Sequence, residues 1–214
     1  RPQAMTGTPD APATAATELA DEDRARAEFY ALLGRLYGAA PDAPLLAAIG
    51  ASALWPDDGE NPLAGAWNRL VLGSRTADAE AVEQEYTDLF IGVGKAECNL
   101  HASYWTRDAG AEPPLVALRA ELAAMGLARQ GGSAPYEDHL AALCETMRIL
   151  VAGAAGRSPE TISTQRAFFA RRIAPWVEEC CTAIAQCPIA NYYAQVAQFT
   201  DLFMALERDS FAIE

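Results

Sequence analysis

The stretch Phe29-Tyr30-Ala31-Leu32-Leu33-Gly34-Arg35-Leu36-Tyr37 decides the fold class of this chain. Its large apolar residues recur at intervals of three and four, so they fall on one face of an α-helix. Acidic residues crowd the segment before it, between residues 18 and 23, where the helix dipole favours negative charge. The stretch therefore predicts an amphipathic helix with one buried face.

The same spacing recurs along most of the chain, broken by Pro- and Gly-containing segments. No segment alternates apolar and polar residues in the manner of a strand. The sequence predicts an all-α fold, with a single globular domain of about eight to ten helices over residues 18–214. Helical segments are expected at Ala39–Ala53, Leu63–Val71, Val82–Phe90, Leu115–Met125, from Pro135 to Val151, from Ser158 through Cys180, and at Tyr192–Leu206.

The first 17 residues are rich in Ala, Thr and Pro, and they predict a disordered tail. Met5 is a candidate native start, which would make residues 1–4 an addition to the natural chain. This tail has no apolar segment of the kind that a signal peptide requires. The pair Arg171-Arg172 lies deep in the chain with no apolar export segment behind it, so we do not expect this protein to carry a twin-arginine signal itself.

Length and charge narrow the class of protein. A chain of 214 residues can bury roughly 70% of its unfolded surface, so its core needs no disulfide or metal support. Its 29 acidic and 16 basic residues give a net charge of −13. This charge repels nucleic acid and speeds the encounter with basic partners. It is equally typical of a bacterial protein that uses charge only to stay dispersed.

Cysteine usage predicts neither a disulfide framework nor a metal site. The five cysteines include no Cys-x-x-Cys motif, and the chain has only two histidines. We expect reduced, mostly buried thiols and no bound metal or other cofactor. No apolar run approaches the roughly 20 residues that a membrane crossing needs, so we expect a cytoplasmic protein without stable membrane insertion.

Three short motifs stand in order along the chain. The first is Glu85-Tyr86-Thr87-Asp88-Leu89-Phe90-Ile91-Gly92, followed by Ser103-Tyr104. The second is Pro135-Tyr136-Glu137-Asp138-His139-Leu140, and the third is Phe168-Phe169-Ala170-Arg171-Arg172-Ile173-Ala174-Pro175-Trp176. Each is weak alone, but the ordered set, with Tyr192-Tyr193 near the end, resembles the TorD/DmsD/NarJ family of redox-enzyme maturation chaperones. Arg172 stands where the family's third motif has His.

This resemblance implies a TorD-like chaperone domain that binds the twin-arginine signal peptide of a molybdopterin-containing oxidoreductase. It would assist folding and cofactor insertion of that catalytic subunit, as a monomer or a homodimer. It implies no nucleic-acid partner. No Ser or Cys nucleophile with a supporting base can be named, and there is no phosphate-binding loop, so we expect no catalytic residues and no enzyme activity.

Recognition of such a peptide requires an apolar groove beside carboxylates, because the peptide joins an arginine pair to an apolar segment. Glu85 and Asp88 are further candidate carboxylates for this groove. Asp138 and His139 are expected in the first turn of a helix, with their side chains turned away from the core. The candidate signal-peptide-binding residues are Tyr86, Leu89, Phe90, Ser103, Tyr104, Trp105, Glu137, Asp138 and His139.

Simpler interpretations stand beside these assignments. Leu89 and Phe90 at helical spacing are more often core residues than groove residues. Asp138 could serve only the helix dipole. The alternative function for the whole chain is a helical small-molecule-binding or regulatory domain, and a small hydrolase is a weaker third hypothesis.

Overall fold

The computed structural model describes residues 19–92, 96–106, 114–127 and 136–213. The predicted tail at residues 1–17 and the expected helix start at Pro135 lie outside these residues. The described residues form ten α-helices and one π-helical turn, η1, and contain no strand beyond two isolated bridges, which confirms the predicted all-α fold. The elements are α1 Asp21–Gly38, α2 Ala43–Gly50, α3 Pro62–Thr76, α4 Ala79–Tyr86, η1 Thr87–Ile91, α5 Ala102–Trp105, α6 Pro114–Ala124, α7 Leu140–Ala152, α8 Ile162–Arg172, α9 Val177–Gln186 and α10 Tyr192–Ile213.

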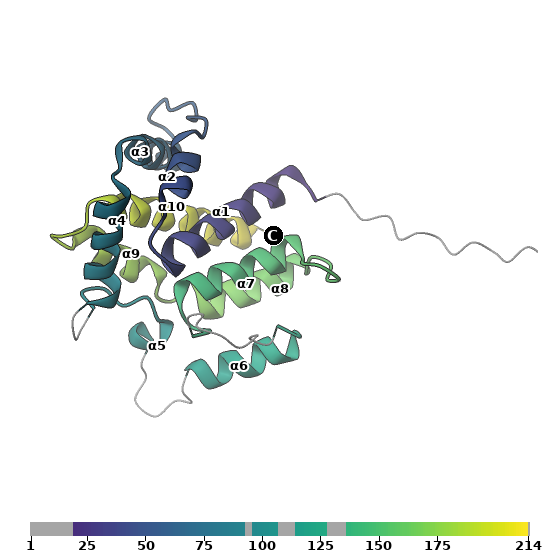
Figure 1. Ribbon diagram of the computed structural model, residues 1–214. Helices are drawn as coiled ribbons and strands as arrows, with labels where there is room; N and C mark the ends of the chain where they lie inside the picture. The colour runs from purple at the N-terminus through teal and green to yellow at the C-terminus, as the bar shows by residue number, and fades with distance from the viewer. Residues whose placement is uncertain (1–18, 93–95, 107–113, 128–135, 214) are drawn as a thin grey trace, which may run out of the picture.

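Helices α1, α7 and α10 form the centre of the molecule. Helix α1 packs along α7, which packs against α8, and α10 packs against α3 and α9 (Figure 1). One continuous cluster of buried apolar residues runs from Ala27 to Phe211. The predicted stripe on α1 faces this cluster, with Leu33, Leu36 and Tyr37 fully buried. Helix α6 lies at the outer edge of the molecule, below α7 and α8 in Figure 1.

Four of the helices begin after residues whose side chains accept backbone N–H groups in the first turn. Asp42, Asn61 and Asp78 do so for α2, α3 and α4, and Thr161 does so for α8. Such caps satisfy N–H groups that have no partner inside the helix. The helical segment expected to begin at Ser158 therefore has its cap three residues later, at Thr161.

The segment from Ser158 through Cys180 was expected to be one helix, and the structure corrects this. Helix α8 ends at Arg172, and a turn at residues 173–176 separates it from α9. Pro175 lies in this turn, and its ring and missing N–H prevent a helix from continuing through it. The apolar residues still match a helical period because Ile173 and Trp176, the first and last residues of the turn, are both buried.

All five cysteines are thiols, and Cys98, Cys144, Cys180 and Cys181 are buried, as predicted. None of the helices in the described part of the chain combines the length and apolar character that a membrane crossing requires.

Candidate functional site

Two of the predicted motifs meet at a short antiparallel pairing between segment 98–105 and the start of α7. The backbone N–H of Ala102 donates to the carbonyl of Asp138 at 2.9 Å, and that of Leu140 donates to the carbonyl of Leu100 at 2.8 Å. His101 and His139 are paired between these two bonds. The structure thus brings Ser103-Tyr104 beside Asp138-His139, although 35 positions separate Ser103 from Asp138 in the chain.

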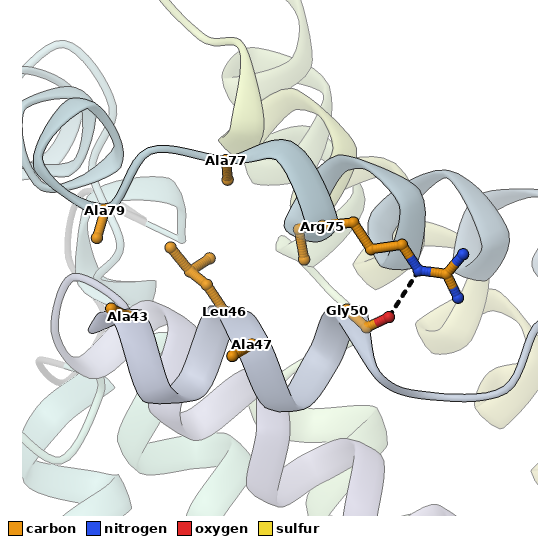
Figure 2. Close-up of a pocket in the computed structure, with 8 residues that line it drawn as sticks. Ala43, Leu46, Ala47, Gly50, Arg75, Ala77 and Ala79 are labelled. Atoms are coloured by element: carbon orange, nitrogen blue, oxygen red, sulfur yellow. Dashed lines mark hydrogen bonds between the residues drawn. The ribbon is translucent and has the colours of Figure 1, made fainter.

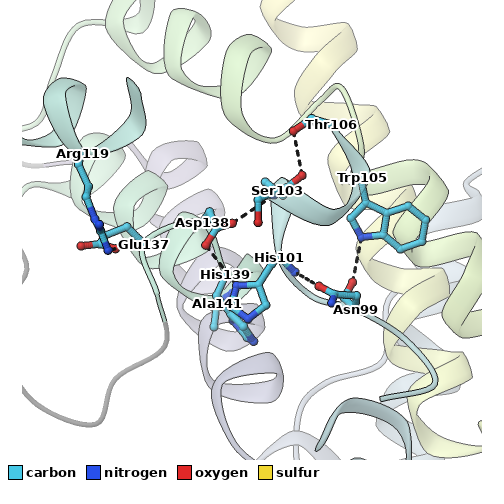
Figure 3. Close-up of polar contacts among 11 residues, drawn as sticks. Asn99, His101, Ser103, Trp105, Thr106, Arg119, Glu137, Asp138, His139 and Ala141 are labelled. Carbon is cyan, nitrogen blue, oxygen red and sulfur yellow. Dashed lines mark hydrogen bonds and ion pairs between the residues drawn. The ribbon is translucent and has the colours of Figure 1, made fainter. Parts of the chain in front are cut away.

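Asp138 connects the two segments through its side chain. One carboxylate oxygen lies 3.2 Å from Nδ1 of His101, and the other accepts the backbone N–H of Ser103 at 3.1 Å (Figure 3). Only 3% of Asp138 is exposed. Burial alone would raise the pKa of this carboxyl, but the hydrogen bonds from His101 and Ser103 outweigh it and lower the pKa to about 2. Asp138 is therefore a carboxylate that positions the segment carrying Ser103.

His139 caps helix α7. Its Nδ1 accepts the backbone N–H of Ala141 at 3.2 Å, and its ring meets the edge of the His101 ring at a centroid distance of 4.9 Å. Burial and the neighbouring His101 lower the pKa of His139 to about 4, so its imidazole is neutral near pH 7.

The expected orientation of Asp138 and His139 is wrong. Both precede helix α7 instead of lying in its first turn, and His139 is only 8% exposed. They are buried because one serves the backbone pairing and the other serves the helix cap. These two residues therefore support the surface around them more than they present a surface of their own.

The exposed part of this region is aromatic. Tyr104 and Tyr136 are 46% and 58% exposed, and Trp105 is half-buried with its indole N–H donating to the carbonyl of Asn99 at 2.9 Å. The rings of Tyr104 and Trp105 meet edge to face at 5.1 Å. Tyr136 lies 6.2 Å from the His101 ring. We call Tyr104, Trp105 and Tyr136 the aromatic ledge.

A carboxylate adjoins the ledge. Glu137 follows Tyr136 directly, and one of its oxygens accepts a hydrogen bond from Arg119 of α6 at 3.1 Å (Figure 3). Glu137 therefore places a carboxylate, 13% exposed, next to Tyr136 of the ledge in the chain.

The motif around Tyr86 packs in the core and connects to the segment that carries the ledge residues Tyr104 and Trp105. Leu89 is fully buried, and the Tyr86 hydroxyl donates to the carbonyl of Tyr37 at 3.1 Å. Phe90 is half-buried and packs edge to face against Tyr86 at 5.2 Å. The carbonyl of Leu89 accepts the N–H of Cys98 at 2.9 Å, which connects this turn to the start of segment 98–105. In this conformation Tyr86 and Leu89 face the core and not a groove.

Glu85 and Asp88 lie apart from the ledge. The side chain of Asp88 is exposed and accepts a hydrogen bond from Gln84 at 2.9 Å. Both oxygens of Glu85 accept backbone N–H groups at the start of α10, from Asn191 at 2.8 Å, Tyr192 at 3.1 Å and Tyr193 at 2.8 Å. Glu85 is therefore a helix cap supplied from another helix.

We expect Glu85→Ala to lower the free energy of unfolding by about 1–2 kcal/mol, because it removes the acceptor of three N–H groups and a negative charge at a helix N-terminus. Glu83→Ala, an exposed site on the same helix, is the control and should change stability by less than about 0.5 kcal/mol. Urea unfolding of both variants measures this. Equal effects at the two positions would show that the cap contributes nothing.

A hollow lies between α2 and the end of α3 (Figure 2). Its lining includes Ala43, Leu46, Ala47, Gly50, Ser74, Arg75, Ala77 and Ala79. Nε of Arg75 donates to the carbonyl of Gly50 at 2.7 Å, and the Ser74 hydroxyl lies 2.9 Å from that of Tyr192. Because the Ser74 hydroxyl and Nε of Arg75 are engaged with the fold and the rest of the wall is mostly alanine, this hollow is a weaker candidate than the ledge.

Sequence reasoning missed His101, Asn99 and Tyr136 as parts of the site. His101 stands two positions before Ser103, but only the pairing across to Asp138 reveals its role. Tyr136 lies inside the second motif and could have been named from its aromatic ring. No group of three or more His, Cys, Asp or Glu side chains within the described ranges is placed to hold a metal ion.

This arrangement, a helical fold with exposed aromatic side chains beside a buried hydrogen-bonded link, is typical of a binding protein. The sequence model of the family described as nitrate reductase delta subunit matches residues 57–182. The chain belongs to this family, which comprises NarJ/TorD-like chaperones for molybdoenzyme maturation and is not catalytic. No curated protein matches the chain.

Proposed function

We propose that this chaperone binds the twin-arginine signal peptide of a molybdoenzyme precursor at the aromatic ledge. The observation that carries the proposal is the buried link from Asp138 to His101 and Ser103, which holds the ledge rigid beside Glu137. A pre-ordered surface loses little conformational entropy on binding.

The chemistry of the ledge matches the two parts of the peptide. Tyr104, Trp105 and Tyr136 offer apolar faces with polar edges, which suit an apolar segment that carries an exposed backbone. The carboxylate of Glu137 suits a guanidinium, which pairs well with carboxylates. Ser103, Asp138 and His139 position this surface, while Tyr86, Leu89 and Phe90 support it from the core.

The proposed client is the catalytic subunit of a molybdopterin-containing oxidoreductase, held in the cytoplasm until its cofactor is inserted. Membership in a chaperone family for molybdoenzymes supports this, and the net charge of −13 would speed the encounter with a basic peptide. Residues 18–214 are proposed to form the single chaperone domain that does this, as a monomer or a homodimer.

Calorimetric titration with the signal peptide of a molybdoenzyme from the same genome tests the proposal. We expect micromolar or tighter affinity, on the order of −8 kcal/mol. Tyr104→Ala and Tyr136→Ala should each weaken binding by about tenfold, because they remove exposed aromatic contact area. Leu72→Ala, an exposed apolar site on α3, is the control and should leave affinity unchanged. The absence of binding to every molybdoenzyme signal peptide of that genome would disprove the proposal.

A further inference from the structure

Glu121 of helix α6 accepts hydrogen bonds from two adjacent arginines at the end of α8. Nη2 of Arg171 donates to one oxygen of Glu121, and Nε of Arg172 donates to the other at 2.6 Å. The Glu121 side chain is only 16% exposed. Burial acts to raise its pKa, but the two guanidinium groups outweigh burial and lower it, so Glu121 remains ionised. Glu121 thus already binds a pair of neighbouring arginines.

This ion-paired group is contiguous with the candidate site. A small cavity beside it is walled by Arg171 and Arg172 together with Ala102, Leu118, Asp138 and Trp176. Asp138 belongs to the site, and Ala102 begins the short helix that carries Tyr104 and Trp105. The arginine pair therefore lines the same cavity as Asp138.

Helix α6 is attached to the rest of the described structure by few side chains. Leu118 and Leu122 are its buried apolar residues. Among the described residues, its ion pairs are those of Glu121 with α8 and of Arg119 with Glu137, which follows Tyr136 of the ledge. Both charged contacts therefore end at the candidate site or at its cavity.

We infer that Glu121 is an arginine-recognition residue, and that the arginine pair of a client peptide replaces Arg171 and Arg172 on it. The inference rests on the proposed function. Exchange of one guanidinium pair for another keeps the number of charge-assisted hydrogen bonds on Glu121, while the displaced Arg171 and Arg172, 57% and 18% exposed, must find water or other acceptors. A lysine pair cannot reproduce these bonds, because an ammonium is a compact charge without the planar fork of a guanidinium. Glu121 would therefore make the protein prefer paired arginines to paired lysines.

Titration of the full chain with a twin-arginine signal peptide and its Lys-Lys version tests this. Glu121→Gln should weaken binding of the arginine peptide by about tenfold or more and change binding of the lysine peptide by less than about threefold. The double variant Arg171→Gln/Arg172→Gln should bind the arginine peptide several-fold more tightly than the unmodified protein, because no internal pair competes for Glu121.

Glu145→Gln is the matched control, since Glu145 of α7 also accepts two guanidinium hydrogen bonds, both from Arg148 at 2.8 and 2.7 Å. Its affinity for both peptides should equal that of the unmodified protein. Melting curves on every variant separate binding from stability. If Glu121→Gln does not fold, the arginine double variant decides alone, and tighter binding supports the inference.

The outcomes separate the inference from the proposed function. If the unmodified protein binds neither peptide, the proposed function fails and the inference fails with it. If it binds the arginine peptide but Glu121→Gln retains full affinity and preference, only the inference is overturned. Weaker binding by the arginine double variant would also overturn it, because Arg171 and Arg172 would then be needed for the site and not compete with the client.

Discussion

Replacement of Asp138 by Ala is expected to lower the free energy of unfolding by about 3 kcal/mol and to abolish binding at the ledge. Asp138 is 3% exposed and accepts from His101 and from the backbone of Ser103, so its removal leaves two partly buried donors without their acceptor. Segment 98–105 would lose its anchor, and the aromatic side chains that it carries would lose their fixed positions. Urea unfolding and peptide titration of the same variant measure the two effects.

Acid should reproduce the loss of stability. The folded pKa of Asp138 is depressed to about 2, below the 3.8 of a free aspartate, so its contribution is fully present above about pH 4. Between about pH 4 and pH 2 the unfolded chain binds the proton first, and roughly 2 kcal/mol of stability is lost. Asp138→Ala should not show this loss, so the difference in stability between it and the unmodified protein should narrow over that window.

Asp88→Ala is the control, because Asp88 is an exposed aspartate that accepts one hydrogen bond from Gln84. It should cost less than about 0.5 kcal/mol. A destabilisation by Asp138→Ala no larger than that of the control would show that the buried link is dispensable, and the ledge would then need another explanation for its order.

Much of the fold could be predicted from the sequence, because the apolar residues that a helix buries recur with the 3.6-residue period of the helix itself. The stripe at residues 29–37 indicates both the helix and the face that packs on the core. Periodicity fails where a helix ends inside an apolar pattern. Ile173 and Trp176 keep helical spacing although Pro175 interrupts the helix, so spacing alone could not locate the turn.

The candidate site was harder to predict because its contacts join distant segments. Asp138-His139 could be selected as a motif, but their burial depends on a backbone pairing with residues 100–102 that no local pattern encodes. The Arg171-Arg172 pair has the letters of a twin-arginine signal but no export segment, so the sequence assigns it no role. Its carboxylate partner, Glu121, lies 50 positions earlier than Arg171. Polar side chains on two helices give no hint in sequence that they face one another.

Glu207 has the largest expected effect on stability outside the site. It is 2% exposed on α10, and its two oxygens accept from Nε and Nη2 of Arg26 at 2.7 and 2.9 Å. The hydroxyl of Tyr30, which is fully buried, donates to the same carboxylate at 2.9 Å. The two partners lie on α1, so this group connects the first and last helices. Glu207→Ala leaves the buried Tyr30 hydroxyl without its acceptor and removes two hydrogen bonds of the Arg26 guanidinium, which keeps its bond to Asp23 at 2.8 Å, and we expect a loss of about 3–5 kcal/mol.

The loss should reflect the unpaired partners more than the net value of the ion pair. The triple variant Arg26→Met/Tyr30→Phe/Glu207→Leu replaces all three polar groups by apolar ones of similar size, and it should unfold within about 1–2 kcal/mol of the unmodified protein. Arg208 lies on α10 like Glu207, and it forms an exposed ion pair with Glu178 of α9 at 3.3 Å. Arg208→Ala should cost less than about 0.5 kcal/mol. Guanidinium chloride unfolding of the three proteins decides the matter. If the triple variant is as unstable as Glu207→Ala, the ion pair itself stabilises the contact between α1 and α10. In that case, replacing all three polar groups by apolar ones would not have restored any of the lost stability.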